Sequence, residues 1–399
     1  MKQEAPQTRR SRAGIPAVHS GERVKPRIAQ VANFVGPHSG GMRTAVDALG
    51  ARYAASGAQR LLVTPGVRDA VVETSAGTHV QLRALEVSGG YRMILEPWRV
   101  LAVLSDFAPT SIEVSDKTTM LPVARWARRA GAGCVLFSHE RLDAMMALRV
   151  GIRSARNAGI STAISTAHRL LTRGFDAIVV TSRYAAGEFP ATARTRLRHI
   201  PLGVDLELFH PRRGRPASDV LRLVHAGRLS REKSPDLAVA TAVELHRRGI
   251  PVRMDVYGQG PLLDTLRRLA ADAPVSFHGH VGGRRELAAA LASADVALSV
   301  CPGETFGLSI LEALASGTPV VTADRGGGRE LVTEASGAWA PPEPPALADA
   351  VLRLASRDAR TARIAARRQA ERFDWSATAG AMLHLHREVA AGLAQVAAP

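Results

Sequence analysis

The stretch Cys301-Pro-Gly-Glu-Thr-Phe-Gly-Leu-Ser-Ile-Leu-Glu-Ala-Leu-Ala-Ser-Gly-Thr-Pro-Val-Val321 decides the fold of this chain. It begins with a glycine-containing turn that leads into an apolar helix, and a short β-type run, Pro319 to Thr322, follows. The turn offers free backbone N–H groups and the positive end of the helix dipole, which together make an anion site. A loop, a helix and a strand in this order are typical of a parallel α/β sheet, here with an anion at the helix start.

Two carboxylates, Glu304 and Glu312, flank that turn. Glu312 lies roughly 1.5 helical turns into the helix, close enough to reach a group attached to the anion. Because carboxylates repel phosphate, we expect both to accept hydrogen bonds from sugar hydroxyls, which predicts a nucleotide sugar as the ligand. The alternative is a solvated loop residue at 304 and a surface charge at 312. The apolar run around Glu312 disfavours it, because an idle carboxylate is costly there.

The composition is that of a globular protein with two domains. The chain has 399 residues, of which 46% are hydrophobic and 22% charged. Cys134 and Cys301 lie far apart without metal-type spacing, so we expect a reduced, cytoplasmic setting and no disulfide framework. No apolar run approaches the roughly 20 residues of a membrane span. Residues 1–26 are basic and polar, which predicts a disordered tail rather than a secretory signal.

The net charge is +16, from 52 Lys+Arg against 36 Asp+Glu. Such a charge favours nucleic acid, an acidic membrane surface or phosphorylated substrates as partners. Nucleic acid is disfavoured, because the arginines are dispersed and few aromatic side chains are available for stacking on bases. We therefore expect affinity for a membrane or for phosphate.

Strand and helix patterns alternate along the chain in two similar halves. A strand at Arg27 to Phe34 starts the first half, and a linker rich in Pro, Gly and charge separates the halves near 200–218. The alternation predicts an N-terminal Rossmann-like domain over 27–205, a C-terminal one over 206–372 and a final segment, 373–399. A cleft between two such domains is the expected ligand site.

Other loops at predicted strand ends carry charge or glycine. Arg228 and Lys233 lie in Gly227-Arg-Leu-Ser-Arg-Glu-Lys-Ser-Pro235, where strand-end loops face the ligand crevice, so both can neutralise a diphosphate. This is not a Walker A loop, because Glu232 occupies the position of the glycine before the lysine. His139 follows another predicted strand, so it is expected to face the same crevice. A purely structural role is equally compatible with a lone histidine. No histidine has metal-site spacing. Weaker candidates are Gly36 to Arg43, Gly258 to Pro261, Gly279 to Val281 and Gly326 to Gly328.

Taken together, these residues resemble the retaining glycosyltransferases of the GT-B fold, of the GT4 type. The resemblance covers nearly all of residues 27–380, and the landmarks of the family occur in order. Gly303 departs from the pattern, since many relatives have a polar residue before the first glutamate. The landmarks are Gly227-Arg228 with Lys233, Tyr257-Gly-Gln-Gly-Pro261, Phe277-His-Gly-His-Val281, the pair Glu304 and Glu312, Gly326-Gly-Gly-Arg-Glu-Leu-Val332 and Phe373-Asp-Trp375, where a final helix would cross back to the N-terminal domain.

The resemblance implies a role for each matching residue. Arg228 and Lys233 would bind the donor diphosphate, and Glu312 would bind the ribose. Glu304 would hold the transferred sugar, with His139 beside the reacting centre. The remaining donor-binding positions are Gly40, Gly41, Gly258, His280, Val281, Phe306, Gly307 and Leu308.

The first half resembles more narrowly the actinobacterial GDP-mannose-dependent phosphatidylinositol-mannoside mannosyltransferases. This resemblance rests on Gln30-Val-Ala-Asn-Phe34 with Gly36-Pro37, Ser39-Gly-Gly41 and Arg43-Thr-Ala-Val-Asp47, on Gly89-Gly-Tyr-Arg92 and on Ser138-His-Glu-Arg-Leu-Asp143. It implies GDP-mannose as the donor, an anionic mannosylated phosphatidylinositol on the inner membrane leaflet as the acceptor, retention at the sugar carbon, and no metal or other cofactor. Three alternatives stay open: a transferase using another UDP- or GDP-sugar with a soluble or secondary-metabolite acceptor, a GT-B-like epimerase, and a non-catalytic binding protein.

Two segments of the first half suit a membrane surface. They are Ser88 to Arg99 and Leu121 to Arg129, in which Trp and Tyr lie beside Arg. The alternative is that Trp98 and Trp126 are half-buried core residues and that the arginines form a solvated helix face. The sequence leaves the oligomeric state open.

Overall fold

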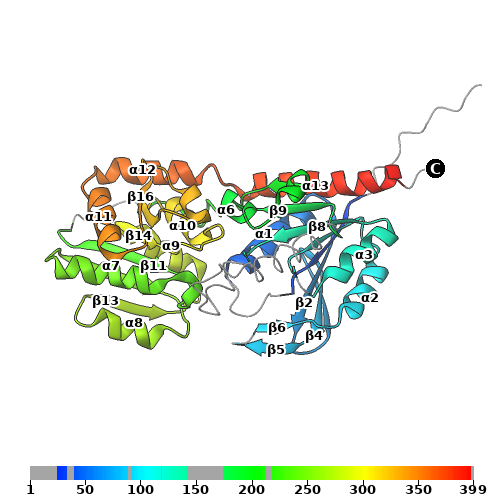
Figure 1. Ribbon diagram of the computed structural model, residues 1–399, viewed down its shortest axis with the longest axis horizontal. Helices are drawn as coiled ribbons and strands as arrows, with labels where there is room; N and C mark the ends of the chain where they lie inside the picture. Colours follow the sequence, from blue (N-terminus) through cyan, green and yellow to red (C-terminus); the bar gives the residue numbers. More distant parts are fainter. Residues whose placement is uncertain are drawn as a thin grey trace, which may run out of the picture.

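Two Rossmann-like α/β domains lie side by side, and the chain crosses back at its end, so that the C-terminal helix lies on the N-terminal domain (Figure 1). The computed structural model describes residues 25–33, 40–88, 91–117, 119–141, 174–212 and 218–396. Residues 1–24 of the predicted tail, 34–39 of the first glycine-rich turn and 213–217 of the linker lie outside these ranges, as do 142–143. Within the described ranges, no helix is long and apolar enough to cross a membrane.

The N-terminal domain contains an eight-stranded sheet in the order β10-β9-β8-β7-β1-β2-β4-β3. Neighbouring strands are parallel except β3 and β4, which form an antiparallel edge. The strands are β1 (Arg27–Val31), β2 (Gln59–Gly66), β3 (Ala70–Thr74), β4 (Gly77–Arg83), β7 (Ser111–Val114), β8 (Gly133–Ser138), β9 (Ala177–Val180) and β10 (Leu197–His199). The hairpin β5 (Leu85–Ser88) and β6 (Tyr91–Met93) lies apart from it, and the helices are α1 (Gly41–Ala55), α2 (Pro97–Phe107), α3 (Leu121–Ala130), α6 (Arg183–Ala186) and the 3-10 helix η1 (Ala191–Arg196).

The C-terminal domain contains a parallel six-stranded sheet in the order β13-β12-β11-β14-β15-β16. Its strands are β11 (Leu221–Ala226), β12 (Val252–Tyr257), β13 (Val275–Gly279), β14 (Val296–Ser299), β15 (Val320–Ala323) and β16 (Gly337–Ala340). Its helices are α7 (Pro235–Arg247), α8 (Leu263–Ala270), α9 (Arg284–Ser293), α10 (Leu308–Ala315), α11 (Pro344–Ala355), α12 (Ala359–Ala370) and the 3-10 helices η2 (Arg231–Lys233) and η3 (Gly327–Leu331).

The predicted fold class is confirmed, with one difference at the sheet edge. The sequence pattern did not predict the hairpin of β3 and β4. Val71 and Val72 are 68% and 48% exposed, so β3 lacks the alternation of buried and exposed side chains that marks a half-buried strand. Because β3 pairs antiparallel with β4, the N-terminal sheet is mixed rather than wholly parallel.

Helix α13 (Trp375–Val396) ends the chain but packs on the N-terminal domain, against α1, β7 and β8 (Figure 1). A Cβ atom on Gly133 of β8 would lie 2.5 Å from Cγ2 of Val389, so glycine permits this close approach. The linker from the first domain runs beside the start of α13, where the Val204 amide donates to the Phe373 carbonyl at 2.9 Å. The chain therefore crosses between the domains twice at one place.

A buried polar network fastens α13 to the N-terminal sheet. Glu113 of β7 is 1% exposed and accepts hydrogen bonds from Gln30 Nε2 and Tyr53 Oη, each at 3.0 Å. Nε2 of His386 in α13 lies 3.4 Å from the same carboxylate, and Nδ1 lies 3.0 Å from Ser111 Oγ. Burial alone would raise the pKa of Glu113, but His386 and the two hydrogen bonds lower it below its usual value. Glu113 is therefore held as a carboxylate.

Replacing Glu113 with Ala is expected to cost about 3 kcal/mol of unfolding free energy, because it leaves buried polar partners unpaired. Glu86→Ala is the matched control, since its ion pair with Arg92 is on the surface and its side chain is 53% exposed. The control is expected to cost less than about 1 kcal/mol. Urea unfolding monitored by circular dichroism measures both, and equal losses would contradict the proposed role of the network.

Candidate active site at the domain junction

Loops from the two sheets meet at what we call the domain junction, defined by three contacts. A Cβ atom on Gly41 would lie 3.3 Å from Cδ1 of Leu308, the first residue of α10. Ser182 Oγ donates to the Thr305 carbonyl at 2.6 Å, and Arg228 Nη1 donates to Tyr91 Oη at 3.1 Å. Gly41, the first residue of α1, therefore faces the start of α10 in the other domain.

Glu304 and Lys233 form the central ion pair of the junction. Lys233 Nζ lies 2.7 Å from Glu304 Oε2, and the two side chains are 33% and 10% exposed. Burial alone would lower the pKa of Lys233, but the charge and hydrogen bond of Glu304 more than offset it, so the pKa is raised. Cys301 Sγ donates to the Glu232 carbonyl at 3.0 Å, which ties the lysine loop to the glutamate loop. Lys233 is thus a fixed, permanently charged group beside a carboxylate.

Arg228 reaches between the domains. Its guanidinium lies 3.4 Å from Glu232 and donates to Tyr91, on the β5–β6 hairpin of the other domain. Tyr91 was predicted as part of a membrane surface, but the structure places its hydroxyl on Arg228. The contact joins residues 137 positions apart, so no local pattern could indicate it.

The start of α10 is a candidate anion site. Gly307, with φ of 105°, precedes Leu308, and in the described chain no side chain caps this helix. Phe306 is 5% exposed and packs edge-to-face on Phe373, with 6.4 Å between ring centroids. The Gly327 amide donates to the Glu304 carbonyl at 2.6 Å and fixes the loop before the helix. The side chain of Phe306 therefore belongs to the core, and only the backbone groups of this residue can meet a ligand.

Glu312 lies in the second turn of α10, with its side chain 15% exposed. Arg284 Nη2 is 3.5 Å from Glu312 Oε1, and its guanidinium stacks on the Phe209 ring at 5.4 Å. Burial raises the pKa of Glu312 to about 7, and the Arg284 charge offsets this only in part. Near neutral pH this carboxyl group therefore exchanges between its protonated and ionised forms, and hydroxyl donors would favour the ionised form.

Gly258 has a structural reason to be glycine. Its φ is 147°, and a Cβ atom there would lie 1.8 Å from the Gly227 carbonyl oxygen. The loops after β11 and β12 therefore pack backbone against backbone, which positions the loop of Arg228.

Three other predicted donor-binding residues lie apart from the pair of Glu304 and Lys233. His280 is exposed and Val281 half-buried, and in the described chain no hydrogen bond or ion pair joins either residue to that pair. Gly40 has no atom within 4 Å of a Cβ placed on it.

His139 follows β8 on the N-terminal side of the junction. Its ring stacks on Phe137 at 4.3 Å, and its Nε2 atom is buried without a hydrogen-bond partner. Burial lowers its pKa to about 4, so the imidazole is neutral near pH 7. Lys117 Nζ donates to the Glu140 carbonyl and pairs with buried Glu188 at 2.5 Å, which anchors the loop. Sequence analysis missed Lys117, because its partners are distant in the chain.

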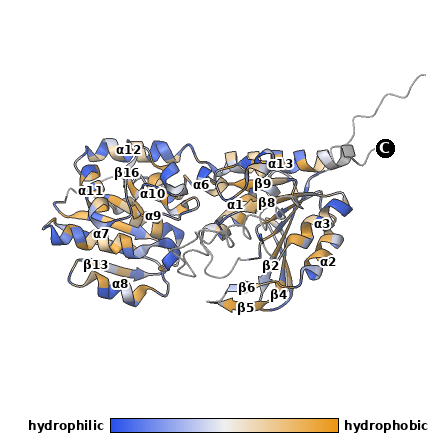
Figure 2. Cartoon of the chain, viewed as in Figure 1, coloured by the Kyte–Doolittle hydropathy of each residue, from blue (hydrophilic) through white to orange (hydrophobic). Residues whose placement is uncertain are grey.

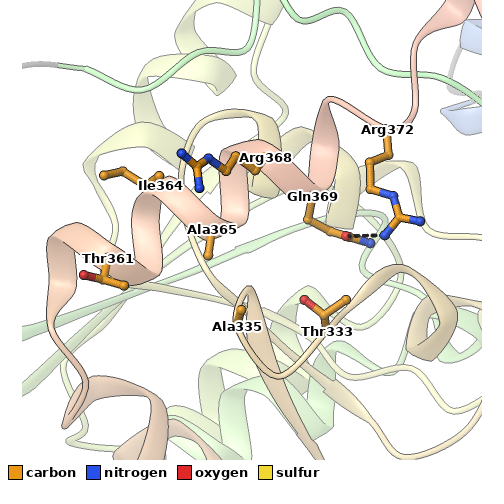
Figure 3. A pocket seen from close by; sticks show the side chains of 8 residues that line it. All are labelled: Thr333, Ala335, Thr361, Ile364, Ala365, Arg368, Gln369 and Arg372. Atoms are coloured by element: carbon orange, nitrogen blue, oxygen red, sulfur yellow. Dashed lines mark hydrogen bonds between the residues drawn. The ribbon is translucent and has the colours of Figure 1, made fainter.

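A surface groove lies elsewhere on the C-terminal domain (Figure 3). It runs between α12 and a neighbouring turn and contains none of the predicted site residues. In the described ranges no group of three or more His, Cys, Asp or Glu side chains could hold a metal ion. The groove residues are Thr333, Ala335, Thr361, Ile364, Ala365, Arg368, Gln369 and Arg372.

Comparison with known families identifies the two halves of the chain. The family model described as "Glycosyl transferases group 1" matches residues 221–357, and "Glycosyl transferase 4-like domain" matches residues 40–203. The chain is 41% identical to the GDP-mannose-dependent alpha-(1-6)-phosphatidylinositol dimannoside mannosyltransferase of Mycobacterium tuberculosis, over 90% of this chain and 95% of the relative. It is 32% identical to the corresponding monomannoside mannosyltransferase of Mycolicibacterium smegmatis, over 52% and 56% of the two chains.

Solved structures show the same fold. Sucrose-phosphate synthase from Thermosynechococcus elongatus superposes with a TM-score of 0.75 at 22% identity, covering 92% of this chain and all of that one. HepE from Anabaena in complex with UDP-glucose has a TM-score of 0.68 at 19% identity, covering 92% and 99% of the two chains. At these identities the likeness concerns the fold alone.

Glu312→Gln is expected to stabilise the protein more at pH 8 than at pH 5. The native carboxyl group, with a pKa of about 7, keeps a proton that the unfolded chain, with a pKa of 4.5, has lost. The free energy of unfolding of the wild type therefore falls as pH rises from about 5 to 7. The amide variant lacks this pH-dependent loss, because its side chain does not titrate. Melting temperatures of both proteins across this range measure the effect, with exposed Glu286→Gln as the control. A pH-independent difference between Glu312→Gln and wild type would refute the raised pKa.

Proposed function

The chain belongs to the group 1 glycosyltransferases with a glycosyltransferase 4-like N-terminal domain, and on this basis we propose that it transfers mannose from GDP-mannose to a phosphatidylinositol mannoside. The observation that carries the proposal is the Lys233–Glu304 pair at 2.7 Å, set at the open start of α10 and facing the Gly41 turn. Relatives named as GDP-mannose-dependent phosphatidylinositol mannosyltransferases support the choice of sugar and acceptor.

In this proposal the donor diphosphate binds to Lys233, Arg228 and the backbone amides at the start of α10. Fixed cations and amides stabilise the charge that develops on the departing GDP. Glu304 holds the mannose and Glu312 the ribose through their hydroxyls. A metal ion has no part in the proposed mechanism, since the side chains and the helix supply the positive charge.

Neutral His139 fits a place beside the sugar in this scheme. An imidazole with a pKa near 4 does not add a cation next to a sugar carbon that becomes positive during transfer. Its unpaired Nε2 is free to exchange a hydrogen bond with a sugar hydroxyl. The acceptor hydroxyl attacks from the side of the leaving group, which retains the configuration.

The Lys233–Glu304 contact also predicts a change when the donor binds. Without a ligand each group satisfies the other, and the raised pKa keeps the lysine protonated. A diphosphate competes for the ammonium group, which releases Glu304 to accept from the sugar. Binding thus exchanges one ion pair for two ligand contacts, at little desolvation cost.

Purified protein should transfer mannose from GDP-mannose to phosphatidylinositol mannosides, and Lys233→Ala should lower kcat/KM by roughly 100-fold or more. Arg231→Ala is the matched control, because Arg231 lies in the same 3-10 turn but is exposed. A panel of GDP- and UDP-sugars with lipid and soluble acceptors, read by mass spectrometry, measures the specificity. Transfer only from a UDP-sugar or only to a soluble acceptor would favour the alternative transferase, and equal activity of the two variants would remove Lys233 from the site.

Membrane docking is a further part of the proposal, through what we call the apolar rim. It consists of exposed apolar side chains within residues 67–98 of the N-terminal domain. Strand β5, in the lower part of this domain, has the colour of hydrophobic residues in Figure 2. Trp98 is 62% exposed, which contradicts the alternative of a half-buried core residue, whereas Trp126 is half-buried as that alternative states. The rim residues are Val67, Val71, Val72, Leu85, Val87, Leu95 and Trp98.

Charge contributes less to this surface than the sequence suggested. Arg92 pairs with Glu86 at 2.9 Å, and Arg99 pairs with Asp69 at 2.6 Å, so neither faces the solvent as an isolated cation. Nearby α3 keeps Arg125, Arg128 and Arg129 exposed. We therefore assign insertion to the apolar rim and attraction of anionic lipids to α3.

The double variant Leu85→Ser and Val87→Ser should bind anionic vesicles at least about fivefold more weakly than wild type, because apolar area inserted at the interface is lost. Val220→Ser with Leu269→Ser is the matched control, since these side chains are 39% and 38% exposed on the other domain. Co-sedimentation with phosphatidylinositol vesicles at low and high salt measures binding. Equal loss in both double variants, or no binding by wild type at low salt, would remove the rim from the proposal.

A further inference from the structure

A carboxylate of the donor-binding domain is bonded to backbone amides of the other domain. Glu330 lies in η3, and its Oε2 and Oε1 atoms accept from the N–H groups of Arg183 at 2.9 Å and of Tyr184 at 2.8 Å. These are the first two residues of α6, where amides have no partner within the helix. Ser182 Oγ accepts from the third amide, that of Ala185, at 2.9 Å. The first turn of α6 is thus completed by a residue from the opposite domain.

Glycine at position 327 makes this contact possible. A Cβ atom on Gly327 would lie 1.9 Å from the Thr305 carbonyl oxygen and 2.8 Å from Ser182 Oγ. The Gly327 amide also donates to the carbonyl of Glu304. The loop that carries Glu330 therefore holds the backbone of the sugar-binding glutamate and touches the first domain at the same time.

The same turn of α6 also contacts the loop of His139. Arg141 Nη1 donates to the Tyr184 carbonyl at 2.9 Å, and its guanidinium stacks 4.4 Å above the Tyr184 ring. Arg141 is two residues beyond His139. Tyr184 consequently links Glu330, through its amide, to the histidine loop, through its carbonyl and ring.

We propose that Glu330 is an interdomain positioning residue, whose carboxylate docks the donor domain on α6 and thereby sets the His139 loop over the donor sugar. This inference rests on the proposed transferase function. Glu330 is exposed, so water competes for the amides and the contact can form and break as the domains move. A carboxylate at a helix N-terminus is favourable, but solvent screening limits its strength.

Glu330→Ala should lower kcat for mannosyl transfer about 10-fold, with KM for the donor and Kd for GDP unchanged within about twofold. The reason is that Lys233, Arg228 and the start of α10, to which the proposal assigns the diphosphate, all lie on the second domain, while the histidine loop loses its support. Glu330→Gln should retain intermediate activity, since an amide oxygen can accept from only part of the pair. Glu334→Ala is the matched control, because Glu334 is exposed in the following loop and its backbone carbonyl accepts from Arg357.

A reciprocal pair of variants isolates the amide of Arg183. Proline at the first position of a helix fits the backbone and removes only the N–H group, and Ser182 already has the extended conformation required before proline, with φ of −150° and ψ of 162°. Arg183→Pro should therefore reproduce the loss seen in Glu330→Ala, whereas Arg183→Ala should not. The double variant Glu330→Ala with Arg183→Pro should lose no more than either single variant.

Three results would overturn the inference: full activity of Glu330→Ala, a rise in the Kd for GDP that matches the loss of activity, or additive losses in the double variant. Small-angle scattering with and without GDP gives a readout independent of the acceptor, and Glu330→Ala should show the larger radius of gyration. If the wild type transfers another sugar, the proposed donor is wrong. The positioning role is then tested by comparing the same variants with the donor that the wild type uses. If scattering and turnover are both unchanged, the positioning role fails and the function stands.

Discussion

Backbone-to-backbone packing around Glu304 is the constraint on which the rest of the junction depends. Gly307, Gly326 and Gly327 each occupy a position where a side chain would meet a neighbouring atom within 3 Å. Only with these contacts can a carboxylate lie 2.7 Å from Lys233 and also next to the open start of α10. The glycines therefore supply geometry rather than flexibility, and the charged groups act from fixed positions, as electrostatic stabilisation requires.

Several arginines of the chain stabilise the fold through hydrogen bonds to backbone carbonyls or buried side chains. Arg367 of α12 donates to the carbonyls of Leu206, Phe209 and Ala315, at 3.2, 2.7 and 3.0 Å, so one guanidinium joins the interdomain linker to the end of α10. Arg60 is 5% exposed and donates to Gln30 in the network of Glu113. The net charge of +16 thus overstates the charge that is available to a membrane or to phosphate.

The sequence predicted those features that local pattern controls. The β-type run predicted at Pro319 to Thr322 is β15, and the first predicted strand contains β1, because both are apolar runs buried within a sheet. No strand was predicted at β16, because Gly337–Ala340 is short and has little pattern. The cluster of Glu304, Lys233 and Arg228 was predicted because each follows a strand. The contacts of Tyr91 with Arg228 and of Glu330 with Arg183 join residues 137 and 147 positions apart, and geometry alone brings them together. Gly258 was predicted as a donor-binding residue from a family motif, whereas the structure explains the glycine by the close approach of the Gly227 carbonyl oxygen.

The N-terminal domain can complete its fold only after helix α13 has been synthesised. The N-terminal core keeps a vacant face over α1, β7 and β8 until the last 22-residue helix is synthesised, because His386 and Val389 are the partners of Glu113 and Gly133. On the ribosome the first domain must therefore wait for the whole second domain to emerge before it can close. A nascent chain that stops short of α13 exposes a buried carboxylate and an apolar sheet face, which is the kind of surface that chaperones bind.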